Sequence, residues 1–318
     1  TEKMRLCIND AMDIHGGKGI CMGPNNYLAR GYQGAPIAIT VEGANILTRS
    51  MIIYGQGAIR CHPFVLAELE AANKADEGEA LDEFDHALFG HIGYALSNIF
   101  RSVWFSLTGA RFTKTPHNDK TKRYYQNMTR LSTNLAMLSD IAMLSLGGDL
   151  KRRERTSARL GDMLSFLYLS SAALKRYQDE GRQIEDLPLL QWAVEDCLFQ
   201  LEQAMLELMR NFPNKLVGKI MKVITLPFGT CQTRPSDKIE HRVARILQTP
   251  SPARDRLGAG QYLTREPENI LGQLEQTLDD IIACEPIFKK ICRGLATDLP
   301  FYHLDQVAKK GLEANVIN

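Results

Sequence analysis

The chain has 318 residues and a mass of 35.7 kDa, which exceeds the roughly 100–200 residues of one domain and predicts two. Its 38 lysines and arginines nearly balance 37 aspartates and glutamates, so it lacks the basic excess that is typical of nucleic-acid-binding proteins. Its mean hydropathy is −0.21 without a long apolar run, which excludes the membrane-spanning class. Seven cysteines without a CxxC pair favour a reducing cytosol over disulfides or zinc.

A glycine-rich turn follows the first predicted helix. The sequence DAMDIHGGKG, from Asp10 to Gly19, carries three glycines within its last four residues. Glycines let the backbone turn sharply and approach a ligand closely, and the N–H groups of such a turn can bind a phosphate. A plain helix C-cap explains the same residues, and taken by themselves they favour the cap.

A single carboxylate, Glu42, stands in the apolar run from Ile37 to Ile46 and is followed directly by Gly43. Burying a lone charge is costly unless the charge is paired or serves a function. One interpretation is a glutamate at a helix N-terminus, where the helix dipole stabilises it. The other is a general base in a dry cleft, where burial raises its pKa. A helix-like stretch follows as far as Ile59.

An acidic segment marks a predicted boundary. Eight aspartates and glutamates between positions 68 and 85 share the segment with one lysine, and Gly78 lies among them. This composition favours a solvated linker. We therefore divide the chain into residues 1–72 and a helical part of residues 73–318.

Helical periodicity dominates the rest of the chain. Apolar residues at three- and four-residue steps predict a helix over residues 79–108 and two more within the proline-free stretch 117–187. Gly147, Gly148 and Asp149 separate these two, which predicts an antiparallel helical hairpin. Another helix is predicted over residues 188–210. Shorter ones are expected after Asn214, Pro235 and Pro267. No segment shows sustained strand-like alternation, so the predicted fold is an all-α helical bundle.

The segment 214–228 predicts a basic amphipathic helix, because Lys215, Lys219 and Lys222 share a face beside large apolar side chains. Such a helix binds an anionic membrane surface, and an ordinary core-facing helix fits the pattern equally well. The seven histidines show no HxxxH or HExxH spacing, so no metal site is predicted.

The glycine turn and the Glu42 segment, in this order along the chain, resemble the C-terminal helical domain of the acyl-CoA dehydrogenases. In that family a DAxQIxGGxG turn precedes a catalytic EG turn, and residues 10–19 and 41–43 align with these motifs. The sequence QGAPIAITVEGANILTR, residues 33–49, is similar to bacterial members that act in fatty-acid β-oxidation. The likeness continues through residues 157–168 and 241–247, so it covers essentially the whole chain.

The resemblance implies the second half of that helical domain, followed by a helical extension, in a cytoplasmic FAD-dependent enzyme. It implies oxidation of an acyl-CoA to the trans-2-enoyl-CoA, in which Glu42 takes the α-proton and the β-hydrogen leaves as hydride to N5 of FAD. The backbone N–H of the base is expected to hydrogen-bond the thioester oxygen. Substrate contacts are implied for Val41 and Gly43. Flavin contacts are implied for Asp13, Gly16, Gly17, Gly19 and Asn45.

The sequence departs from the family pattern in places. Asp13 replaces the glutamine of the glycine motif, and Ala44 and Ile46 replace the threonine and glutamine after the EG turn. Asn45 or the backbone is expected to take over those flavin contacts. The N-terminal helical and middle β domains of the family are missing, so we expect a C-terminal fragment that is inactive alone.

The resemblance also implies an acyl-CoA substrate and a homodimer as partners. From the basic amphipathic pattern of residues 214–228 we further expect peripheral contact with a bacterial inner membrane. From the charge balance we expect no nucleic-acid partner. The alternative is a non-catalytic helical module that docks on a membrane or on a partner.

Overall fold

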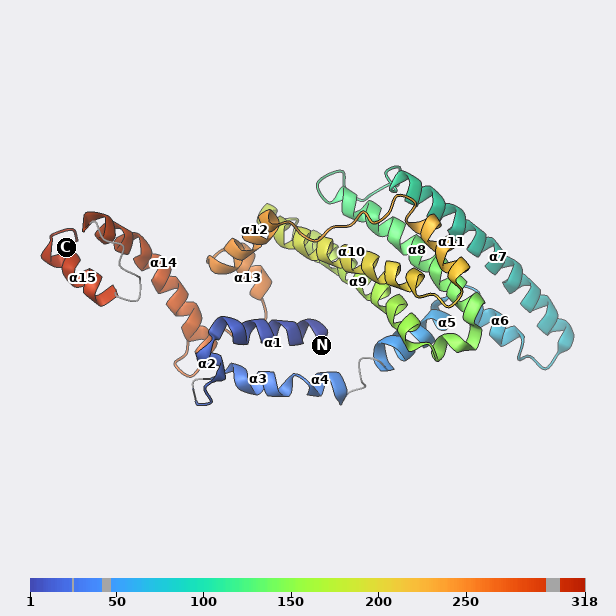
Figure 1. Cartoon of the computed structure of the whole chain (residues 1–318), viewed down its shortest axis with the longest axis horizontal. Helices are drawn as coiled ribbons and strands as arrows, with labels where there is room; N and C mark the ends of the chain where they lie inside the picture. The colour runs from blue at the N-terminus through green and yellow to red at the C-terminus, as the bar shows by residue number, and fades with distance from the viewer. Residues whose placement is uncertain (25, 42–46, 296–303, 318) are drawn as a thin grey trace. The chain divides into compact units, whose positions relative to one another are not determined.

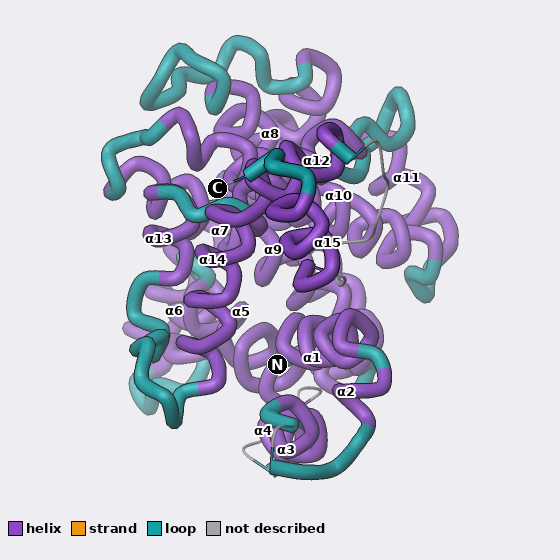
Figure 2. Tube along the Cα trace, turned by 90° about the vertical axis from the view of Figure 1, so that its left-hand side faces the viewer, coloured by secondary structure: helices purple, strands orange, loops and turns teal. Residues whose placement is uncertain are grey.

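The computed structural model of the chain describes residues 1–24, 26–41, 47–295 and 304–317. Every regular element within these ranges is a helix, and no strand occurs among them (Figure 2). The predicted all-α class is therefore confirmed. Among the described helices, none combines the length and the apolar character that crossing a membrane requires.

The chain folds into two compact units, which we describe separately. The first contains residues 1–7 and 33–245, and the second contains residues 8–32 and 246–318. In Figure 1 the helices from α5 (Gly57–Cys61) to α11 (Lys215–Thr225) all belong to the first unit. The division at residue 72 that the composition indicates stays a prediction.

Three consecutive long helices build the core of the first unit. These are α8 (Lys122–Leu146), α9 (Glu154–Asp179) and α10 (Leu187–Arg210), the last preceded by a short 3-10 turn, Ile184–Asp186. The chain leaves α8 at Gly147, whose φ of 51° favours glycine, and a 3-10 turn then leads to α9. The predicted break between the two helices is confirmed. One apolar cluster joins the three helices and includes Leu131, Leu138, Leu160, Met163, Leu198, Leu201 and Met205.

Two further helices contact this bundle. The 32-residue α7 (Glu77–Thr108) begins at Asp76, whose carboxylate accepts the N–H groups of the second and third following residues at 2.9 Å. The shorter α11 (Lys215–Thr225) packs on the C-terminal end of α10. Its approach is close, because a Cβ atom on Gly218 would lie 2.4 Å from the carbonyl oxygen of Met209.

The acidic segment is mostly helical rather than an extended linker. It forms the end of α6 (Val65–Ala71) and the first turns of α7, and only residues 72–76 connect the two helices. Several of its carboxylates lie in the first turns of α7, where the helix dipole favours negative charge. Lys74 adds ion pairs to Glu79 and Glu83 at 2.9 and 2.6 Å. Local capping and charge pairing thus make a helix from a composition that is typical of a linker.

The second unit is built from shorter helices and one long one. The helix α1 (Glu2–His15) enters it, and α2 (Gly17–Ile20) and α3 (Leu28–Gly34) follow. The helix α12 (Asp237–Gln248) belongs to the first unit up to Arg245 and enters the second with its last residues. The helices α13 (Pro252–Gly258), α14 (Ile270–Gly294) and α15 (Leu304–Glu313) complete the second unit.

Two contacts hold the C-terminal helices of the second unit together. Arg254 of α13 donates two hydrogen bonds to the carboxylate of Glu275 on α14, one of them 2.6 Å long. The helix α15 lies close to α14, since a Cβ atom on Gly311 would lie 2.9 Å from the side chain of Ile291. Neither of these two contacts is predicted from the sequence.

Candidate functional site

The glycine turn predicted after the first helix is present in the second unit. The helix α1 ends at His15, and Gly16 adopts φ 53° and ψ −133°, a region that is essentially restricted to glycine. The N–H of Gly16 donates to the carbonyl oxygens of Met12 and Asp13 at 3.0 and 3.2 Å. The chain then enters α2 at Gly17.

The three glycines of the turn have different surroundings. A side chain added at Gly16 or Gly17 would meet no atom within 4 Å, so this side of the backbone is open. A Cβ atom on Gly19 would instead lie 3.2 Å from the carbonyl oxygen of Met12. Asp13 is exposed on the last turn of α1. A ligand could therefore approach the backbone at Gly16 and Gly17, whereas Gly19 packs inward.

The side chain of Asn26 holds this turn in place, a role that the sequence analysis missed. Its Nδ2 donates to the carbonyl oxygens of Gly19 and Cys21 at 2.7 and 3.1 Å. Its Oδ1 accepts the N–H groups of Leu28 and Ala29 at 3.1 and 2.9 Å, which caps α3. An asparagine just before a helix is a capping signal, and it could have been recognised on that ground.

A second side-chain pair supports the turn. His15 Nδ1 lies 2.8 Å from the carbonyl oxygen of Ala11, so this nitrogen carries the ring proton. The Tyr27 hydroxyl therefore donates to His15 Nε2 at 2.5 Å. Burial raises the pKa of Tyr27, which keeps this hydroxyl protonated.

The predicted catalytic segment is only partly described. Val41 follows the short helix α4 (Ile37–Thr40), donates its N–H to the carbonyl oxygen of Ile37 at 3.0 Å and exposes its side chain. Glu42, Gly43 and Asn45 lie outside the described residues. The predicted substrate-side and flavin-side roles of these residues therefore stay predictions.

The segment that follows Glu42 is anchored to the core of the first unit. It forms a π-helix (Leu47–Gln56), in which Arg49 pairs with Asp162 of α9 at 2.9 Å and the Tyr54 hydroxyl donates to Ser139 of α8 at 2.8 Å. Gly161 lets it approach, since a Cβ atom there would lie 3.2 Å from the carbonyl oxygen of Arg49. Burial raises the pKa of Asp162 although Arg49 opposes the shift.

A cluster in the first unit contains three side chains of the metal-ligating type. The ligand atoms of His62, His91 and Asp140 lie within 4.8 Å of one another. Yet His62 Nδ1 accepts the N–H groups of Phe64 and Val65 at 3.2 and 3.1 Å, which places the ring proton on Nε2. That Nε2 donates to Asp140 at 3.0 Å, so its lone pair is not free for a metal. His62 lies between α5 and α6, His91 on α7 and Asp140 on α8, so the cluster brings these three parts of the first unit together. The expectation of no metal stays a prediction.

The comparisons agree with this all-helical architecture. The family model for the bacterial-type C-terminal domain of acyl-CoA dehydrogenases matches residues 59–318, which is most of the chain. The chain therefore belongs to this family. No solved structure matches it. The match begins after the glycine turn and the Glu42 segment, so the roles of those residues rest on their motifs.

Proposed function

We propose that the chain is part of an FAD-dependent acyl-CoA dehydrogenase that oxidises acyl-CoA to trans-2-enoyl-CoA in fatty-acid β-oxidation. The observation that carries the proposal is the order of the chain. The segment with the glycine turn and the Val41-Glu42-Gly43 motif is followed directly by a region that matches the C-terminal domain of this enzyme family.

Glu42 is the proposed base. Its carboxylate takes the α-proton of the thioester, and its own backbone N–H donates to the thioester oxygen, where negative charge develops. Gly43 leaves room for the thioester, and Val41 contacts the substrate beside it. When bound, FAD supplies the acceptor for the β-hydrogen, which leaves with its electron pair.

The glycine turn is proposed to contact the flavin. The open backbone at Gly16 and Gly17 supports this role, because a phosphate or adenosine group could approach there without meeting a side chain. Asp13, Gly19 and Asn45 complete the proposed set. In this proposal the flavin is held mainly by a neighbouring subunit, so flavin retention depends on a homodimer.

A near-isosteric substitution tests the base. In the polypeptide that carries this chain behind the flavin-binding domains, Glu42→Gln should retain flavin and lower turnover by roughly 10²–10⁴-fold. The matched control is Glu70→Gln on α6, an exposed glutamate that should leave turnover unchanged. Turnover of Glu42→Gln close to that of the control would rule out Glu42 as the base.

A specific observation favours peripheral membrane contact as a second function. Three large apolar side chains of α11, Leu216, Ile220 and Val223, are 66%, 50% and 69% exposed. They alternate with the exposed Lys215, Lys219 and Lys222. The alternative from the sequence was an ordinary core-facing helix. A different set of apolar side chains, Val217, Met221 and Ile224, packs against the core and leaves the first three exposed.

An exposed surface of this kind suits an anionic membrane. Each lysine near such a surface contributes about 1 kcal/mol, and burial of the apolar side chains adds to it. The chain should co-sediment with anionic vesicles at low salt, and Lys215→Glu, Lys219→Glu and Lys222→Glu together should abolish this. A matched triple change at exposed lysines of the second unit, Lys289, Lys290 and Lys309, should weaken binding far less. Equal sedimentation of both variants would exclude α11 as the membrane contact.

A further inference from the structure

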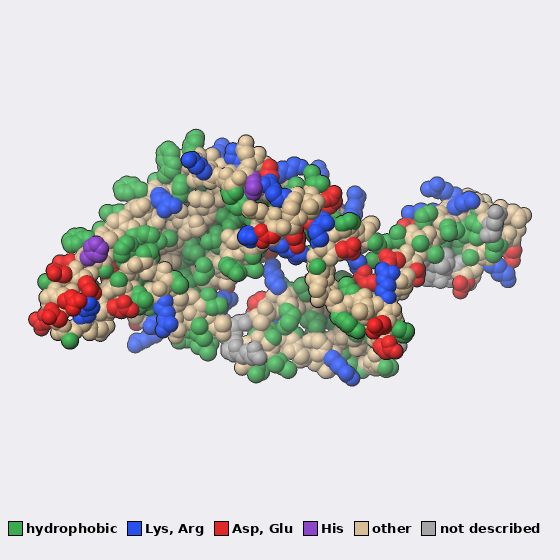
Figure 3. Space-filling model, turned by 180° about the vertical axis from the view of Figure 1, so that it is seen from behind, with side chains coloured by type: hydrophobic (Ala, Val, Ile, Leu, Met, Phe, Trp, Pro, Cys, Tyr) green, Lys and Arg blue, Asp and Glu red, His purple; other side chains and the backbone are tan. Residues whose placement is uncertain are grey.

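The helix α7 carries an apolar stripe that no described part of the chain covers. Its opposite side is buried against the first unit through Ala87, Asn98, Ser102 and Ser106. On the outer side lie large apolar side chains that are 46% to 72% exposed, namely Phe89, Ile92, Leu96, Phe100, Trp104 and Leu107. Figure 3 shows hydrophobic side chains projecting along the outer edge of this part of the molecule.

The spacing of the stripe keeps its residues on one face of α7. Phe89 and Leu96 lie seven residues apart, and so do Phe100 and Leu107. The successive steps of three, four, four, four and three residues form one apolar face, which is the kind of face that a helix packs against a neighbour. From Asp82 to Leu107 this face is about 37 Å long at 1.5 Å per residue. An exposed apolar surface of this length usually marks an interaction site.

The two ends of the stripe carry opposite charge. Five carboxylates from Glu77 to Asp85 lie in the first turns of α7, where Figure 3 also shows a group of acidic side chains. Arg101 lies near the other end, and Arg111 and Lys114 follow just beyond it. Within the described residues, Asp82, Asp85, Arg111 and Lys114 make no ion pair, so these charges are available to a partner.

The surface also has a matching notch and projection. A Cβ atom on Gly93 would meet nothing within 4 Å, so the stripe is recessed there. Seven residues further, Phe100 projects with 72% of its surface exposed. If two copies of α7 run antiparallel about an axis between Leu96 and Ser97, Gly93 faces Phe100 and Phe89 faces Trp104. The same antiparallel arrangement brings the acidic first turns of one α7 to the end of the other helix, which Arg111 and Lys114 follow.

We propose that the α7 stripe is the interface with a second copy of this chain, paired antiparallel about a two-fold axis near Leu96. A two-fold interface requires a self-complementary surface. The apolar centre of the stripe, the recess at Gly93 that faces Phe100, and the oppositely charged ends all meet this requirement. Charge selects this partner over a membrane, because the acidic end of the stripe would be repelled by anionic lipid. The inference does not depend on the proposed activity.

Self-association of the 318-residue chain tests the interface. Sedimentation equilibrium should yield a species of twice the 35.7 kDa chain mass. Leu96→Glu and Phe100→Glu should each weaken dimerisation by about tenfold or more. The matched control is Leu144→Glu, since Leu144 of α8 is also strongly exposed but lies outside the stripe. Equal dimerisation of all three variants, or a purely monomeric parent chain, would overturn the proposal. So would stripe variants that lose only vesicle binding.

Cross-linking tests the antiparallel direction. Leu96→Cys lies beside the proposed axis and should form a covalent dimer on mild oxidation, beyond the background of the parent chain. His86→Cys should not, because its own copy would lie about 31 Å away at 1.5 Å per residue, opposite Leu107. Cross-linking of both variants would indicate parallel pairing and overturn the proposed register.

Charge reversal offers an independent check. Asp82→Lys with Asp85→Lys should weaken dimerisation, and so should Arg111→Glu with Lys114→Glu. The chain with all four substitutions should recover dimerisation close to that of the parent, because opposite charges again face each other. Failure of the fourfold variant to recover, with its helical content intact, would contradict the pairing.

Discussion

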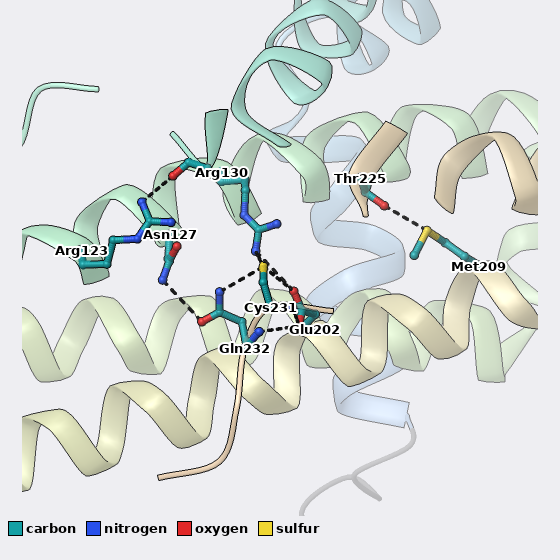
Figure 4. A network of polar contacts seen from close by, with 9 residues as sticks. Arg123, Asn127, Arg130, Glu202, Met209, Thr225, Cys231 and Gln232 are labelled. Atoms are coloured by element: carbon teal, nitrogen blue, oxygen red, sulfur yellow. Dashed lines mark hydrogen bonds and ion pairs between the residues drawn. The ribbon is translucent and has the colours of Figure 1, made fainter. Parts of the chain in front are cut away.

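Glu202 and Arg130 form a buried ion pair that fixes an extended segment of the chain to the helical core. Arg130 Nη2 of α8 lies 3.3 Å from Glu202 Oε1 of α10, and their side chains are only 4% and 0% exposed. The other carboxylate oxygen of Glu202 accepts the N–H groups of Cys231 and Gln232, both at 2.8 Å (Figure 4). The carboxylate of Glu202 thus accepts hydrogen bonds from backbone N–H groups that have no helical partner.

Loss of this carboxylate should be costly. Glu202→Ala leaves Arg130 charged and unpaired in the interior, and we expect the free energy of unfolding in urea to fall by about 3–5 kcal/mol. Glu207→Ala, five residues along the same helix, is the control, because Glu207 is 64% exposed and pairs only at the surface. Its loss should cost at most about 1 kcal/mol. Comparable losses in the two variants would contradict the central role of Glu202.

The packing of α11 on α10 should depend on Gly218. A Cβ atom there would lie 2.4 Å from the backbone oxygen of Met209, which cannot move like a side chain. We expect Gly218→Ala to lower the free energy of unfolding by about 1–3 kcal/mol. Gly148→Ala, at a position where a Cβ atom meets nothing within 4 Å, should change it by less than about 0.5 kcal/mol. A neutral Gly218→Ala would mean that α11 does not lie this close to α10.

Substitution of the two open glycines, Gly16 and Gly17, should affect the stability of the turn differently. Gly16→Ala places a Cβ atom on a backbone with φ 53° and ψ −133° and should destabilise the turn by about 1–3 kcal/mol. Gly17→Ala carries no such strain and should leave it intact. Hydrogen exchange of the amides of residues 16–21 measures both effects. Faster exchange in Gly17→Ala than in Gly16→Ala would refute this assignment of the strained residue.

The contact between Arg254 and Glu275 should make the second unit sensitive to acid. Hydrogen bonds from Arg254 are the main cause that lowers the pKa of Glu275 below its usual value. A carboxyl with a lowered pKa in the folded state stabilises above its unfolded pKa, and this contribution is lost as the pH falls through the folded pKa.

Hydrogen exchange of α13 and α14, corrected for the intrinsic rate at each pH, checks this dependence. At pH 7 we expect Glu275→Gln to reduce their protection by roughly 0.5–1 kcal/mol, since the pair is partly exposed. At pH 3 the difference from the parent chain should shrink. A difference that grows on acidification would reverse the sign of the linkage and contradict the pairing.

The helices could be located from the sequence because their signals are local. The break at Gly147, the helix up to Thr108 and the helix from Leu187 follow from apolar periodicity and glycine placement within each segment. The all-α class and the family resemblance likewise need no knowledge of packing. The structure of the acidic segment could not be predicted in this way, because its composition suits a linker as well as a helix. Capping by Asp76 and bridging by Lys74 are what make its second half helical.

Pairing across the chain was decided only by the tertiary structure. Glu202 stands among apolar positions of α10, and its partner Arg130 is 72 residues away in the sequence. On α11, apolar residues lie on both sides of the helix, so periodicity could not choose whether Val217 or Leu216 would be buried. The approach of α10 at Gly218 made that choice. Local chain geometry determines where helices begin and end, whereas the burial of each face depends on neighbours that are distant in the sequence.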